Sequence, residues 1–155
     1  MIRRCTIADK EKWCELNLAF MKYEYDEQNV WENPLKAGEL SETFEKIIND
    51  NNSPNLLLFI QEGSEIIGFI NAAYFFSIWA HGKALFIDDF FIIEEFRSKG
   101  YGRKALQDLE IEMKRKRFKR FQLLAEDTNP RAIQFYEREN YSRQRLNFFC
   151  KYFVK

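Results

Sequence analysis

The amino-acid sequence predicts a mixed α/β fold, with a largely antiparallel sheet flanked by helices in one domain over residues 1–155. The chain length of 155 residues is that of one ordinary domain. Apolar residues recur at helical spacing in some segments and at strand spacing in others. Two central strand-like runs are joined by the short loop "QEGSE", which makes their strands antiparallel. The expected order is roughly β-α-α-β-β-β-α-β-α-β.

The N-terminal part is expected to form a short strand and two amphipathic helices. The opening "MIRRCTI" alternates as a strand does, and Trp13 and Phe20 then share one face of a helix. Thr6 or Asp9 can cap that helix. A second helical pattern starts after Pro34 and ends in "NDNNSPN", a cluster of residues that favour a loop.

The rest of the chain is expected to alternate between strands and helices. The run "NLLLFIQEGSEIIGFINAAYFF" predicts a hairpin, and "GKALFIDDFFII" predicts the strand that follows it. Helical spacing then extends from Tyr101 to about Lys116. Three further elements follow: a strand in "RFQLLAED", a short helix in "NPRAIQFYEREN" and a last strand in "LNFFCKYFV".

Composition argues against several classes of function. Lys and Arg number 24, as do Asp and Glu, so there is no net charge to attract nucleic acid or an anionic membrane. Cys5, Cys14 and Cys150 are widely spaced, and with His81 as the single histidine they predict neither a metal site nor a Cys-His catalytic pair. The sequence has no signal peptide or membrane-spanning run, so we expect a reduced, cytoplasmic protein.

The segment "RSKGYGRKAL" joins a predicted strand to a predicted helix through Gly100 and Gly102. Backbone N–H groups at a helix start can surround an anion, and glycine lets a phosphate approach closely. A plain turn would also explain these glycines. A dinucleotide fingerprint that uses Ala105 and Glu126 is disfavoured, because the polar "EEFRSK" precedes the glycines and little chain follows Glu126.

With Arg97 included, this turn resembles the Arg/Gln-x-x-Gly-x-Gly/Ala pyrophosphate loop of the GNAT superfamily of acyl-CoA N-acyltransferases. The expected element order is similar to that fold, and the resemblance covers nearly the whole chain. More narrowly, "KYEYDEQ", "YFFSIWAHGKALFIDDFFIIEEFRSKGYG" and "AEDTNPRAIQFYERENY" resemble stretches of the spermidine/spermine (diamine) acetyltransferase group. The resemblance implies an acetyl-CoA-dependent N-acetyltransferase that forms a homodimer.

The resemblance also implies roles for individual residues. Tyr136 would protonate the departing thiolate, although such an aromatic residue is also typical of a core. Glu24, Asp88 and Asp89 would line the amine side of the site. The coenzyme would bind the following residues: Phe90, Phe91, Ile92, Arg97, Ser98, Lys99, Gly100, Tyr101, Gly102, Arg103 and Asn129.

Asp88 and Asp89 are adjacent carboxylates in an apolar, strand-like run. An alkylamine is protonated at pH 7, because its pKa is about 10.4, so the enzyme must attract a cation and then remove a proton. Carboxylates can do both. Adjacent strand residues point to opposite faces, so both can face one site only if the strand is bulged. We therefore expect a bulge and favour Asp88 as the base, with Asp89 and Glu24 as alternatives. Without a function, one of the two aspartates would be an exposed strand residue and the other would form an ion pair.

Departures from the diamine group bear on the substrate. Ser98 stands where that group usually has a further glycine, and Ile78 stands where the polyamine enzymes carry an acid. The tail "YSRQRLNFF" is basic where they carry another acid. We expect a small primary amine, a diamine, polyamine or lysine-like amino acid, with long polycations disfavoured. The alternatives are an acetyltransferase for protein lysines or N-termini and a non-catalytic CoA-binding module.

Overall fold

A computed structural model describes residues 1–25, 39–151 and 153 of the chain. The chain divides into two compact units, Met1–Leu123 and Leu124–Lys155. In the described residues, the first unit holds the sheet and three α-helices, and the second holds one helix. That the two units fold as one domain stays a prediction.

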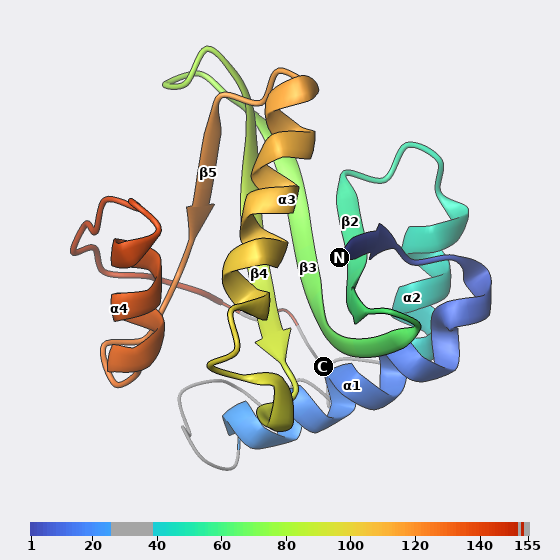
Figure 1. The fold of residues 1–155 in the computed structure, drawn as a ribbon. Helices are drawn as coiled ribbons and strands as arrows, with labels where there is room; N and C mark the ends of the chain where they lie inside the picture. The colour runs from blue at the N-terminus through green and yellow to red at the C-terminus, as the bar shows by residue number, and fades with distance from the viewer. Residues whose placement is uncertain (26–38, 152, 154–155) are drawn as a thin grey trace. The chain divides into compact units, whose positions relative to one another are not determined.

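A five-stranded sheet forms the centre of the first unit, in the order β1-β2-β3-β4-β5 (Figure 1). Its strands are β1 Ile2–Arg4, β2 Asn55–Glu62, β3 Glu65–Ser77, β4 Gly82–Ile92 and β5 Arg120–Leu123. The pairs from β1 to β4 are antiparallel, and β5 runs parallel to β4. The sheet is therefore mixed and mostly antiparallel, as the sequence predicts.

Four α-helices accompany these strands in the described residues: α1 Lys10–Tyr23, α2 Leu40–Asn49, α3 Tyr101–Arg115 and α4 Pro130–Arg138. Short 3-10 helices cover Ile7–Asp9 and Glu94–Phe96. None of the helices in the described part of the chain is long and apolar enough to cross a membrane. The start of the second helix after Pro34 cannot be compared, since Pro34 lies outside the described residues.

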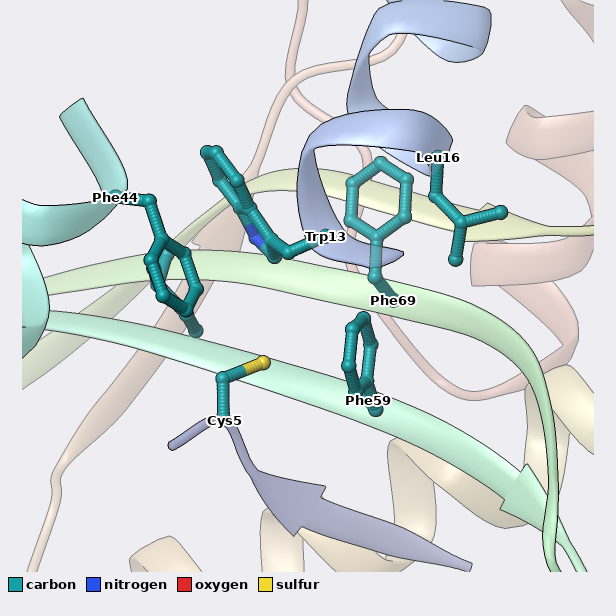
Figure 2. Packing of buried hydrophobic residues seen from close by; sticks show 7 residues of the cluster. Cys5, Trp13, Leu16, Phe44, Phe59 and Phe69 are labelled. Atoms are coloured by element: carbon teal, nitrogen blue, oxygen red, sulfur yellow. The ribbon is translucent and has the colours of Figure 1, made fainter. Parts of the chain in front are cut away.

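The apolar faces of α1 and α2 meet those of β2 and β3 in one cluster (Figure 2). The Trp13 ring on α1 lies 5.3 Å from the Phe44 ring on α2, centroid to centroid. Phe44, Phe59 and Phe69 have no exposed surface. Burying aromatic rings of this size contributes several kcal/mol of stability in total, and it fixes both helices over the strands that carry the site.

The last predicted strand does not form in the described residues. Residues 142–151 and 153 are neither helix nor strand. Leu146, Phe149 and Phe153 are exposed instead. An aromatic, β-prone sequence indicates which side chains suit a strand, but a strand forms only where a neighbouring backbone is available for pairing. The preceding strand is also shorter than predicted, since β5 ends at Leu123.

Candidate active site

Strand β4 is bulged at the two adjacent carboxylates. Asn71 on β3 pairs with Asp89, whereas the next residue, Ala72, pairs with Ile87. Asp88 is therefore an extra residue in the ladder, and the alternation of side chains between the two faces is broken there. The bulge predicted from the sequence is confirmed.

Both carboxylates line one cavity of about 280 Å³ in the first unit. Its walls come from α1, α2 and strands β2 to β4. Most of the wall is apolar, built from Trp13, Met21, Leu40, Ile47, Leu57 and Phe86. The described lining contains no ionisable groups besides Asp88 and Asp89. The cavity therefore combines an apolar wall with a local negative charge, which suits a protonated amine on an apolar stem.

Burial changes the acid strength of both carboxyl groups. It raises the pKa of Asp89 to about 6, against the lowering effect of a hydrogen bond from Asn71 and with a smaller raising effect from the charge of Asp88. The Asp88 side chain is more exposed, and desolvation raises its pKa as well. A carboxylate with a pKa near 6 is ionised at pH 7 and still basic enough to accept a proton. These properties suit Asp89 for the role of base.

Asn71 links Asp89 to helix α1. Its Nδ2 donates hydrogen bonds to Asp89 Oδ2 at 2.8 Å and to Asn17 Oδ1 at 2.6 Å. Its Oδ1 accepts from Trp13 Nε1 at 3.0 Å. Sequence reasoning missed these residues, although a polar residue within the apolar run "GFINAAYF" was a usable signal. Asn17 carried the same signal, since it lies four residues after Trp13 on the buried face of a helix.

Glu24, the third predicted carboxylate, follows the last residue of α1 and is half-buried. Met21, three residues earlier, lines the cavity, but Glu24 is not among the described residues that do so. The structure thus brings Asp88 and Asp89 together at the cavity and places Glu24 at a helix end. Its role stays a prediction.

The predicted pyrophosphate loop has a backbone suited to an anion. Ser98 and Gly100 have left-handed φ angles of 62° and 85°, and α3 begins at the next residue, Tyr101. Left-handed residues that alternate with right-handed ones direct successive N–H groups into a concave anion site. The first N–H groups of a helix also lack intrahelical partners. These features fit a pyrophosphate group, and Arg97 Nε ties the loop to β4 by donating to the Ile92 carbonyl at 2.7 Å.

The two edges of β4 differ in how far their strand pairing extends. Phe90, Phe91 and Ile92 pair with β3. On the other edge, β5 pairs with β4 from Ala84 to Ile87. The pairing of these two described strands therefore ends beside the bulge, and an extended ligand can add to a strand of this kind.

The second unit carries Asn129 and Tyr136. Asn129 caps α4, since its Oδ1 accepts from the Ala132 N–H at 3.0 Å. The Tyr136 ring contacts the rings of Phe135 and Tyr141, with centroids 5.1 and 5.7 Å away. Burial raises the pKa of Tyr136, so its hydroxyl keeps its proton at neutral pH. This state suits a proton donor.

In the described part of the chain, no group of three or more His, Cys, Asp or Glu residues could hold a metal ion. His81 lies exposed between β3 and β4 with a left-handed φ of 51°, as expected for a loop residue.

Comparisons with known proteins concern the family and the fold of this chain. The model of the acetyltransferase (GNAT) family matches residues 11–141. An aminoglycoside acetyltransferase from an uncultured soil metagenomic sample, solved with sisomicin, is 18% identical, with a TM-score of 0.76 over 98% of this chain and 95% of that chain. A possible acetyltransferase from Clostridium difficile 630 is 17% identical, with a TM-score of 0.79 over 100% and 98% of the two chains. At such identities the likeness concerns the fold.

Proposed function

The chain belongs to the acetyltransferase (GNAT) family, and we propose that it transfers the acetyl group of acetyl-CoA to a primary amine of a small molecule. The observation that carries this proposal is the bulge in β4, which places two carboxylates at one largely apolar cavity. Its volume of about 280 Å³ is at the small end for ligand pockets. A diamine or a lysine-like amino acid fits this description better than a long polycation.

Acetyl-CoA supplies the acetyl group as a thioester, and the chain has residues to hold it. The backbone of Ser98 to Arg103 would bind the pyrophosphate, assisted by the helix dipole of α3 and by the cation of Lys99. The main chain of Phe90 to Ile92 would pair with the pantetheine arm, since the pairing of β5 with β4 ends just before it, at Ile87. Asn129 would also contact the coenzyme.

The amine would react directly in a ternary complex. Asp88 and Asp89 attract the ammonium group, and one of them takes its proton, so that the nitrogen lone pair can attack the thioester carbonyl. A new C–N bond forms, the C–S bond breaks, and the nitrogen releases its second proton to solvent, so that a neutral amide results. Peptide N–H groups near Phe90 stabilise the carbonyl oxygen, and Tyr136 donates a proton to the leaving sulfur. Glu24 would contribute negative charge at the amine side.

The proposal also includes that the protein is a homodimer and is located in the cytoplasm. A homodimer is supported by the exposed apolar side chains of the C-terminal segment. A reducing, cytoplasmic location is supported by Cys5, Cys14 and Cys150, which are all unpaired thiols.

The test is thiol release from acetyl-CoA by the purified protein with a panel of amines: putrescine, spermidine, lysine and its analogues, an aminoglycoside and a lysine-bearing peptide. Fast release with a small amine, lost in Asp89→Asn, would support the proposal. Fast release with the peptide alone would indicate a protein substrate. Coenzyme binding without release on any amine would contradict catalysis and favour a binding module.

A further inference from the structure

A buried chain of hydrogen bonds connects helix α1 to the carboxylate of Asp89. Trp13 donates to Asn71, and Asn71 donates both to Asn17 and to Asp89. Asn17 Nδ2 closes the chain on the backbone carbonyl of Trp13 at 2.8 Å. Asn17 is fully buried, and Trp13 and Asn71 are only 3% and 8% exposed, so water does not compete for these bonds.

The chain of bonds has one consistent direction. An indole N–H can donate but not accept, so the Asn71 atom facing Trp13 must be the carbonyl oxygen. The amide nitrogen of Asn71 must then face Asp89 and Asn17. If Asn71 were turned over, its oxygen would face a carboxylate oxygen and its N–H₂ group would face another N–H. Both contacts are unfavourable in a buried site.

The backbone reinforces this orientation. Asn71 lies directly across the ladder from Asp89, and the bulge at Asp88 begins immediately beyond that pair. Desolvation is the only influence on the pKa of Asp88, whereas Asp89 also has a hydrogen bond from Asn71. The two carboxylates of the cavity therefore differ: Asn71 holds Oδ2 of Asp89, and among the described residues no hydrogen bond to its Oδ1 is formed.

We propose that Asn71 is a positioning residue that holds Asp89, and not Asp88, as the carboxylate that receives the proton of the acceptor amine. Trp13 and Asn17 fix the direction of the Asn71 amide. This inference rests on the proposed amine acetyltransfer. It also predicts a physical property of Asp89 that can be measured without turnover.

The charged surroundings of Asp89 are simple. In the described lining of the cavity, Asp88 on the same strand is its one ionisable neighbour; α1 contributes Trp13, Asn17 and Met21, and α2, β2 and β3 contribute only uncharged side chains. The hydrogen bond from Asn71 favours the ionised form of Asp89. Removing that donor therefore makes Asp89 titrate at higher pH.

The experiment is a carboxyl-carbon NMR titration of Asp89 in the coenzyme-free protein. In Asn71→Ala the midpoint should rise by roughly one pH unit, because a hydrogen bond to a charged group is lost. In Asn71→Ser, whose hydroxyl can still donate, the rise should be smaller. Asn55→Ala is the matched control, since Asn55 lines the same cavity but donates to Ser53. An unchanged midpoint in a folded Asn71→Ala protein would overturn the positioning role.

The second measurement is the pH profile of kcat/KM with the best amine of the panel. Its acidic limb should follow the Asp89 midpoint, move upward in Asn71→Ala by the same amount, and persist in Asp88→Asn. A limb that disappears in Asp88→Asn would overturn the assignment to Asp89. If no amine is acetylated, the proposed function fails, while the NMR titration still decides whether Asn71 controls Asp89.

Discussion

Asp9 joins the first strand to the first helix through both of its carboxylate oxygens. The Arg3 guanidinium contacts it at 2.7 Å, and the Thr6 N–H donates to it at 2.7 Å. The Arg3 hydrogen bonds are the main reason why the pKa of Asp9 is lowered to about 2, with further lowering from Thr6. The carboxyl is thus a stronger acid in the folded chain than in the unfolded one.

This difference predicts how stability depends on pH. A lowered folded-state pKa means that Asp9 stabilises the fold fully above its unfolded pKa of about 3.9 and loses this contribution as pH falls through about 2. Asp9→Asn should lower the free energy of unfolding at pH 7 by about 1–2 kcal/mol. Denaturant titrations should show that the difference in the free energy of unfolding between Asp9→Asn and the unmodified protein disappears between pH 4 and pH 2. A difference that stays constant over that range would contradict the prediction. The control is Glu11→Gln at an exposed position.

Tyr136 allows a second prediction for a single atom. Tyr136→Phe removes the hydroxyl and keeps the ring that packs on Phe135 and Tyr141. Turnover should fall roughly tenfold or more, because the leaving thiolate would lose the proton donor proposed for it, with little change in coenzyme affinity. Steady-state kinetics and a binding titration check this. Tyr141→Phe is the matched control, and an equal loss of rate there would argue against a specific role for Tyr136.

At the scale of elements, the backbones of β3 and β4 leave no room for a side chain at Gly68. A Cβ at this position would lie 2.2 Å from the Phe91 carbonyl oxygen, which is backbone and cannot move aside cheaply. Gly68→Ala should therefore displace the end of β4, where the coenzyme arm is proposed to bind. We expect the free energy of unfolding to fall by about 1–3 kcal/mol and acetyl-CoA binding to weaken.

Gly63→Ala, between β2 and β3, is the matched control. Gly63 has a φ of 57°, so a residue with a side chain would lose about 1 kcal/mol of stability there, but its Cβ would meet no atom within 4 Å. Stability should fall, and coenzyme affinity should not. Calorimetric titration of both variants with acetyl-CoA separates the loss of stability from the loss of coenzyme affinity. Equal affinities of the two variants would show that Gly68 does not shape the coenzyme site.

Elements with a local signal could be predicted from the sequence. The spacing of Trp13 and Phe20 indicated α1, and the loop "QEGSE" indicated the β2–β3 hairpin. The bulge followed from a physical conflict, because two adjacent carboxylates on a regular strand cannot face one site. The partners of Asp89 could not be predicted in this way. Asn71 and Asn17 are 54 residues apart in sequence, and only the packing of α1 against β3 brings them together.

At the scale of the whole molecule, the structure of the C-terminal segment differs from the one that its sequence predicts. Leu146, Phe149 and Phe153 are 82%, 87% and 88% exposed. The sequence predicted a strand here, and no strand forms in its described part. Each of these three apolar side chains is about 1.5–3 kcal/mol less favourable in free energy when exposed to water than when buried. A second copy of the chain would supply both the apolar cover and a backbone for strand pairing.

Replacing Leu146 and Phe149 by Ser should therefore convert a dimer into a monomer, and sedimentation equilibrium measures this directly. The unfolding midpoint of the double variant should no longer depend on protein concentration, because mass action stabilises only an associating chain. Trp79→Ser is the control, since Trp79 is 92% exposed on the β3–β4 hairpin and is equally apolar. If Trp79→Ser dissociates the dimer instead, association uses the hairpin. If the unmodified chain sediments as a monomer, the exposed segment does not mediate self-association.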